Sequence, residues 1–84
     1  MDINHSKYTH ITSATTTVLS TVACELDAVR INNAGAGTAT IYDGTNVIAV
    51  LNTANGSGVT YGVFCAKGLS VTTSGNADIT VVWA

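Results

Sequence analysis

The chain has 84 residues, a formal net charge of −2, 46% hydrophobic residues and only 10% charged residues. This length suits one domain with a small core, and the charged fraction is far below the roughly 25% of an average soluble domain. Three cations against five carboxylates provide no basic stripe for phosphates, so nucleic-acid binding is disfavoured. No run approaches the roughly 18 apolar residues of a membrane helix, and the N-terminus lacks a signal-peptide pattern, so we expect no membrane partner.

The first ten residues are polar and contain Lys7, His5 and His10. They lack the turn-bounded alternation of a strand, so we predict an N-terminal arm over residues 1–10 and a domain over residues 11–84. Such an arm would gain order only against a partner, and a frayed terminus without a role is the alternative.

Residues 11–22 are rich in threonine and have no helical apolar stripe. They predict one or two strands, with a weak break near Ser13-Ala14 and with Val18 and Val22 facing inward. In the next apolar segment, inward positions fall at Leu26, Val29 and Ile31, a spacing of three and then two.

That change of phase predicts a β-bulge near Asp27-Ala28, since strict alternation would place one set of side chains outside. The glycine-rich residues 34–37 then predict a turn. A phosphate-binding loop is disfavoured there, because the segment enters a strand and no Lys-Ser/Thr pair follows.

Residues 38–51 form the clearest pattern in the chain, two runs rich in β-branched residues around the polar tip Asp43-Gly44-Thr45-Asn46. They predict a β-hairpin, because glycine, Asp and Asn tolerate the backbone angles of a tight reversal. We expect the Asp43 carboxylate to bind backbone amides of the turn, and Asp78 to do the same in its own turn.

The second half of the chain continues with short alternating segments separated by polar turns. Residues 52–58 have the composition of a surface loop, and residues 59–65 place Phe64 on the face opposite Tyr61 and Cys65. We expect a loop or a subunit to cover Phe64. Two further alternating runs, residues 69–73 and 79–83, complete the set.

These patterns predict an all-β fold, a small antiparallel β-sandwich or jelly roll with about seven or eight short strands and no significant helix. A parallel β-helix is the structural rival, but no short repeat recurs with a fixed period. The predicted core consists of Leu26, Val29, Ile31, Ile41, Val50, Val63, Leu69, Val71, Ile79 and Val81.

Catalytic chemistry is not indicated, because the acidic residues stand singly at strand ends and turns and no set of acid, base and nucleophile converges. A pair of Cys24 or Cys65 with a histidine would need a rigid site, and both histidines fall in the predicted arm. Calcium bound by Asp43, Thr45 and Asn46 is a weak alternative, with too few carboxylates. We predict no enzyme activity, no cofactor and no metal.

Cys24 and Cys65 lie 41 positions apart without the spacing of a metal site. Two cysteines are too few for a disulfide scaffold, and unpaired cysteine is among the most buried residue types. We predict free, packed thiols, with a Cys24–Cys65 bridge as the alternative.

Three stretches carry a resemblance to a known group: GAGTATIYDGT at residues 35–45, CAKGLSVTTSG at residues 65–75 and ADITVVW at residues 77–83. Together they resemble the small β-sandwich structural proteins of tailed-bacteriophage virions, over about residues 26–83. The resemblance implies a non-enzymatic capsid decoration (cement) protein, which sits on the shell as a trimer and contacts the major capsid protein. It also implies synthesis in the cytoplasm of a bacterial host and a final place on the capsid surface.

A cement protein needs a surface that grips the shell, and the predicted arm offers one. We therefore expect capsid contacts from the arm and an oligomer contact from Phe64; the arm residues are Ile3, His5, Lys7, Tyr8 and His10. The alternatives are a head-fibre or tail-associated protein, a carbohydrate- or receptor-binding sandwich and a bacterial domain of no viral origin. The sugar-binding alternative is disfavoured by the assignment of most aromatic residues to strands, which leaves little for a stacking platform.

Overall fold

The computed structural model describes residues 7–33, 35, 37–55 and 58–84. Their secondary structure is eight β-strands and one short 3-10 helix, η1 (Thr53–Asn55). The strands are β1 (Lys7–Ile11), β2 (Thr16–Ser20), β3 (Cys24–Ile31), β4 (Gly37–Asp43), β5 (Asn46–Asn52), β6 (Val59–Cys65), β7 (Leu69–Gly75) and β8 (Ile79–Trp83). No helix in this part of the chain is long and apolar enough to cross a membrane.

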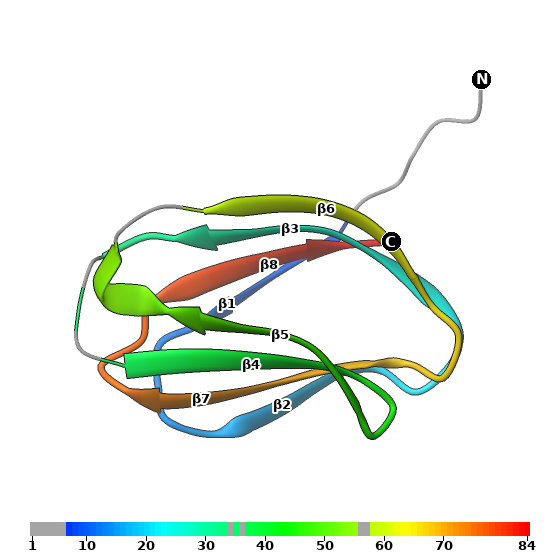
Figure 1. Ribbon diagram of the computed structural model, residues 1–84, viewed down its shortest axis with the longest axis horizontal. Coiled ribbons are helices and arrows are strands. Elements are labelled where there is room, and N and C mark those ends of the chain that lie inside the picture. The colour runs from blue at the N-terminus through cyan, green and yellow to red at the C-terminus, as the bar shows by residue number, and fades with distance from the viewer. Residues whose placement is uncertain (1–6, 34, 36, 56–57) are drawn as a thin grey trace.

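The strands form two four-stranded antiparallel sheets that pack face to face (Figure 1). Sheet A has the order β1-β8-β3-β6, and sheet B has the order β2-β7-β4-β5. If the strands are lettered B to I along the chain, these orders read B-I-D-G and C-H-E-F, which is the arrangement of a jelly roll. The predicted β-sandwich is confirmed, and the antiparallel pairing excludes the β-helix.

The core lies between the sheets and is built from the inward positions of both. Eleven buried residues form it: Ile11, Cys24, Leu26, Val29, Ala39, Ile41, Cys65, Leu69, Val71, Ile79 and Val81. Seven of the ten predicted core residues are in this cluster, and Ile31 and Val63 are partly buried against it. The prediction for Val50 is wrong, because its side chain is 62% exposed on the edge strand β5.

Two local predictions are confirmed by the strand register. The hairpin is β4 and β5, closed by the two-residue turn Gly44-Thr45 with Asp43 opposite Asn46. Gly44 has φ of 61° and no residue other than glycine has positive φ among those described, so among the primed hairpin turns this one is of type II′. The bulge also lies where expected, since β3 shifts register between Leu26 and Ala28 against both of its neighbours.

The predicted strand break is confirmed by the gap between β1 and β2, but two side chains of this region lie elsewhere than predicted. Val18 and Val22 are exposed rather than inward, whereas Leu19 packs against the core. Val18 lies opposite Ser70 on the outer face of sheet B, so the alternation of β2 has the opposite phase. Lys7 to His10 belong to β1, so within the described residues the sandwich includes four positions that were expected in the arm.

Candidate functional site

The described residues enclose no pocket, and among them no group of three His, Cys, Asp or Glu side chains could hold a metal ion. Every buried side-chain nitrogen or oxygen in this part of the structure has a hydrogen-bond partner. Asp43, one of the calcium candidates, accepts a hydrogen bond of 2.9 Å from the backbone N–H of Lys67. Its carboxylate thus binds a backbone amide, but one in the β6–β7 turn rather than in its own turn as predicted. The candidate sites are therefore the outer faces of the two sheets.

The predicted capsid-contact residues of the arm fall into two groups. Ile3 and His5 lie outside the described residues, whereas Lys7, Tyr8 and His10 are on β1 at one edge of sheet A. The Lys7 ammonium lies 4.9 Å from the centre of the Trp83 ring, a cation–π contact at the start of the strand. Tyr8 points outward and is 76% exposed. The sheet thus brings these residues to one edge but gives each a different environment.

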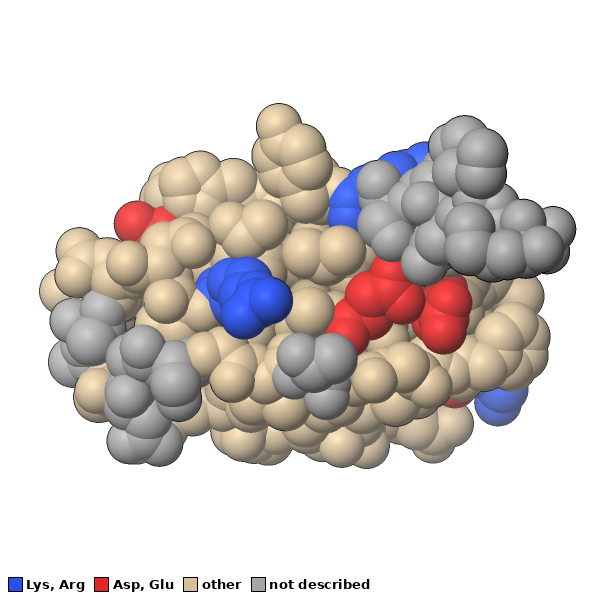
Figure 2. Space-filling model, turned by 90° about the horizontal axis from the view of Figure 1, so that it is seen from above, with Lys and Arg blue, Asp and Glu red and all other residues tan. Residues whose placement is uncertain are grey.

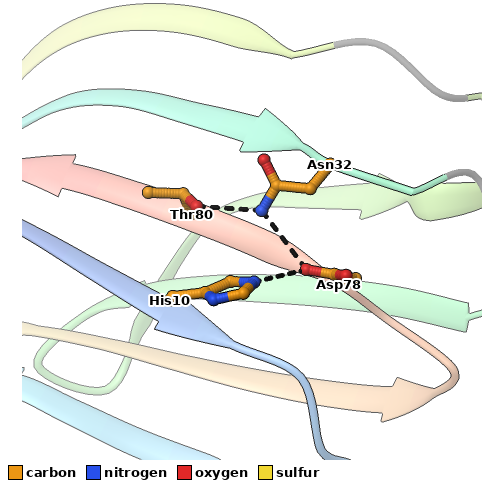
Figure 3. A network of polar contacts seen from close by, with 4 residues as sticks. All are labelled: His10, Asn32, Asp78 and Thr80. Carbon is orange, nitrogen blue, oxygen red and sulfur yellow. Dashed lines mark hydrogen bonds and ion pairs between the residues drawn. The ribbon is translucent and has the colours of Figure 1, made fainter.

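His10 belongs to a polar network on the outer face of sheet A (Figure 3). Its Nε2 lies 2.6 Å from Oδ1 of Asp78, and Asn32 donates from Nδ2 both to the same carboxylate oxygen, at 3.2 Å, and to the Thr80 hydroxyl, at 2.9 Å. Because an ionised carboxylate only accepts, Nε2 carries the proton of the His10–Asp78 bond. The hydrogen bonds from His10 and then from Asn32 lower the pKa of Asp78.

This network joins β1, the β7–β8 connection and β3, and it explains Asp78 better than the turn role predicted from sequence. It contains a His–Asp pair, and the hydrogen bond of the Thr80 hydroxyl within it is to the Asn32 amide. The side chains of His10 and Asp78 are 52% and 30% exposed, on an open surface. The arrangement therefore links neighbouring segments of sheet A through hydrogen bonds.

Two aromatic side chains stand on the outer face of sheet A, at its opposite edges. Tyr8 on β1 is the Cα partner of Val82, which in turn pairs with Ala28, so an apolar row runs across three strands. Phe64 is on the other edge strand, β6, and is 69% exposed. The sequence led us to expect little aromatic surface for a stacking platform, but these two side chains are largely exposed. No loop of the described chain covers Phe64.

Charged side chains accompany these aromatics. Glu25, the Cα partner of Phe64, and Arg30 alternate with core residues of β3 and so lie on the same outer face. Figure 2 looks onto this side of the molecule and shows basic and acidic groups set among uncharged surface. This face can therefore make both apolar and charged contacts.

The outer face of sheet B has a different composition, because none of its residues is charged. Strand pairing arranges it in three rows: Val18, Ser70, Tyr42 and Val47; Thr16, Thr72, Thr40 and Val50; Ser74, Thr38 and Asn52. We call these eleven residues the hydroxyl face. Exposed valines lie on both edge strands, with serine and threonine hydroxyls between them.

Cross-strand hydrogen bonds order part of the hydroxyl face. The hydroxyls of Thr16 and Thr72 are 3.0 Å apart, and those of Thr38 and Ser74 are 2.7 Å apart. β-branched threonine has restricted χ1, so these hydroxyls and methyl groups are held in fixed positions. The assembly of this whole face depends on pairings between distant strands, which no local sequence pattern reveals.

Both cysteines are free and buried, as predicted. Burial, followed by the neighbouring Cys24, raises the pKa of the Cys65 thiol to about 11. The thiols belong to the core cluster whereas His10 is held by Asp78 at the surface, so His10 does not pair with either cysteine. His5, the other histidine considered from sequence, lies outside the described residues.

The fold and its faces define the class of molecule, an antiparallel β-sandwich of jelly-roll topology whose candidate sites are flat sheet surfaces. Comparison of the sequence with protein-family models gives no match, and comparison with curated proteins gives none either.

Proposed function

We propose that this protein is a non-enzymatic structural component of a tailed-bacteriophage virion, a decoration (cement) protein that binds the outer surface of the capsid. The observation that carries the proposal is the hydroxyl face, an ordered protein surface without a single charge. It supports the role suggested by the sequence resemblance, because such a surface can be covered by another protein at low cost. The jelly roll alone would not, since one fold hosts many functions.

The physical reason lies in desolvation. Burying an unpaired charge is very costly, and burying a hydroxyl is tolerated when it keeps a hydrogen bond. On the hydroxyl face, Thr16 and Thr72 already bond to each other, as do Thr38 and Ser74. The exposed valines then add apolar area at the two edges. A capsid subunit with a flat, uncharged surface is the partner that fits, and the protein is made in the bacterial cytoplasm where the shells assemble.

The same proposal includes a cyclic oligomer, most simply a trimer. A ring needs two different surfaces on each subunit, one for each neighbour. Sheet A offers Phe64 on β6 at one edge and Tyr8 on β1 at the other. In the trimer, the Phe64 edge of one copy packs against the Tyr8 edge of the next, which leaves the hydroxyl face of every copy free for the shell.

The shell contact is tested with capsid shells assembled from the major capsid protein encoded in the same genome. Thr40 is central in the hydroxyl face, so Thr40→Lys introduces a charge that shell binding would have to bury, and we expect co-sedimentation with shells to fall at least tenfold. Thr12→Lys, on an exposed connection outside both faces, is the matched control and should bind like the wild type. Equal binding by all three proteins would exclude the hydroxyl face, and absence of the chain from purified virions by mass spectrometry would exclude the decoration role.

The ring contact has its own test, because two different edges meet at each interface. Phe64→Ser and Tyr8→Ser should each sediment as smaller species than the wild type. When the two variants are mixed, the intact Tyr8 edge of one can meet the intact Phe64 edge of the other, so hetero-dimers should form. A wild-type protein that sediments only as a monomer at micromolar concentration would contradict the oligomer.

A second candidate function is supported by the exposure of Tyr8 and Phe64. Aromatic rings displayed on one sheet face can stack on sugar rings, as in carbohydrate- or receptor-binding sandwiches of head fibres and tails. Titration calorimetry against a panel of bacterial surface glycans separates the two functions. Saturable glycan binding that is lost in Phe64→Ser, together with undiminished virion stability without the protein, would favour this second function over decoration.

A further inference from the structure

The two cysteines face each other in sheet A. Cys24 is the first residue of β3, Cys65 is the last residue of β6, and they are direct Cα partners in the antiparallel ladder. Both are in the core cluster, so their side chains point to the same side of the sheet. They are separated by 41 positions in sequence but are brought to adjacent sites by strand pairing.

This geometry fits a disulfide. Directly opposite residues of an antiparallel pair have Cα atoms about 4.5–5.5 Å apart, within the roughly 4.4–6.8 Å that a disulfide spans. The Cys65 thiol also senses its neighbour, since Cys24 is the second cause, after burial, of the raised pKa of Cys65. No change of backbone path is needed to bring the sulfurs together.

The position of the pair in the fold gives the bond a mechanical role. Residues 21–23 lead from β2 in sheet B to Cys24, and residues 66–68 lead from Cys65 to β7 in sheet B. Ser20 and Leu69, at the far ends of these connections, are partners in sheet B. Two crossovers between the sheets therefore run side by side, and the cysteines lie where both enter sheet A.

We propose that Cys24 and Cys65 are a covalent modification site, at which an external disulfide such as oxidised glutathione converts the two thiols into an intrachain disulfide. The Cys24 thiolate attacks one sulfur of the external disulfide and releases one reduced thiol. The Cys65 thiolate then attacks the Cys24 sulfur of the mixed disulfide and releases the second. Two protein sulfurs are oxidised, the external disulfide is reduced to two thiols, and the two protein protons go to the released thiolates.

Cys24 is the entry thiol because it keeps 8% of its surface exposed, whereas Cys65 is fully buried. Reactivity requires the thiolate, which is scarce for a thiol whose pKa is about 11, so the bond forms slowly in the folded protein. It forms rapidly during folding, when the thiols meet the oxidant before they are buried. The disulfide therefore does not form in a reducing cytosol, and it forms when the chain folds or opens in oxidising surroundings.

The experiment compares wild-type protein refolded in reduced and in oxidised glutathione, followed by alkylation under denaturing conditions and intact mass spectrometry. We expect the denatured, oxidised sample to have the mass of one chain without covalent links to another, to have lost two hydrogen atoms and to take up no alkylating reagent. The linked chain should melt roughly 15 °C or more above the reduced chain, because the bond closes a long loop. Addition of a reductant should remove the whole shift.

Two variants provide the controls. Cys24→Ala and Cys65→Ala retain one thiol each, and their melting temperatures should be the same in both glutathione buffers. A stable glutathione adduct on wild-type Cys24, without formation of the Cys24–Cys65 disulfide, would overturn the proposal. So would linkage between chains, or two alkylated thiols after oxidative refolding. The comparison of wild-type protein in the two glutathione buffers remains valid even when neither alanine variant folds.

Discussion

His10 and Asp78 lie 68 positions apart in sequence, yet Nε2 of the histidine is 2.6 Å from Oδ1 of the aspartate. The bond links the edge strand β1 to the connection that precedes β8, its neighbour in sheet A. Asn32, the residue that follows β3, donates to the same oxygen. One carboxylate therefore holds three segments of the sheet together.

Acid should weaken the hydrogen bonds that Asp78 makes with His10 and Asn32. The pKa of Asp78 is lower in the folded state than in the unfolded chain, so the unfolded chain takes up a proton first as the pH falls. The stabilisation is complete above the unfolded value, near 4, and is lost as the pH falls through the folded value. We expect Asp78→Asn to lower the urea midpoint at pH 7, and we expect this loss to shrink as the pH is lowered from 4 to 2.5. Glu25→Gln is the matched carboxylate control, and an equal loss in Asp78→Asn at both pH values would contradict the linkage.

Gly68 should tolerate no side chain. Its φ is 115°, and a Cβ atom would lie 2.5 Å from the backbone oxygen of Ser20. Gly62 has a similar φ of 129°, but a Cβ atom there would meet nothing within 4 Å. Gly62→Ala therefore measures backbone strain alone, about 1–3 kcal/mol, and Gly68→Ala should cost more because it adds the clash. Equal free energies of unfolding for the two variants would show that the backbone at Ser20 and Thr21 moves away from the new Cβ atom at little energetic cost.

Thr73 should hold the connection between β1 and β2 in place. Its buried hydroxyl donates to the backbone oxygen of Ser13 at 2.7 Å and accepts from the backbone N–H of Thr15 at 3.2 Å. Thr73→Val keeps the shape but leaves these groups without a partner, so we expect a loss of about 1–3 kcal/mol. Thr73→Ser keeps the hydroxyl and is the control. Hydrogen exchange should accelerate at the Thr15 amide in the valine variant only.

Leu26 and Val50, which were both predicted to be core residues, should respond differently to truncation to alanine. Leu26 is fully buried, so Leu26→Ala should cost about 2–5 kcal/mol. Val50 is mostly exposed, so Val50→Ala should cost less than about 0.5 kcal/mol in the isolated protein. Denaturant unfolding of both variants tests this contrast. A large loss for Val50→Ala in the isolated chain would mean that a second copy already covers the edge strand β5.

Local chemistry made much of this fold predictable. The Gly44 turn, the bulge beside Asp27 and the alternation of Leu69 and Val71 all depend on residues near one another in sequence. Val18 and Val50 were placed wrongly because alternation fits either face of a strand, and only the partners Ser70 and Thr40 decide between them.

The candidate sites were less predictable for the same reason. The hydroxyl face combines four strands, and the His10–Asp78 bond joins residues from distant parts of the chain. The sequence marks Phe64 as an outward side chain because it alternates with Val63 and Cys65, and the structure places it there. It does not show that Tyr8 stands on the same face, because that depends on the pairing of β1 with β8.

The position of β8 between β1 and β3 governs how this molecule can fold. β3 is complete by residue 31, but its partner on one side begins only at residue 79. β1 is complete by residue 11 and waits even longer, because β8 is its only neighbour among the described strands. Before β8 is in place, β3 pairs only with β6 among the described strands, so one side of β3 is open. β1 then has no partner among these strands. Loop closure over such separations is slow, so we expect folding in milliseconds to seconds as one late, cooperative step. Ribosome-bound chains that stop before residue 79 should therefore remain sensitive to protease throughout.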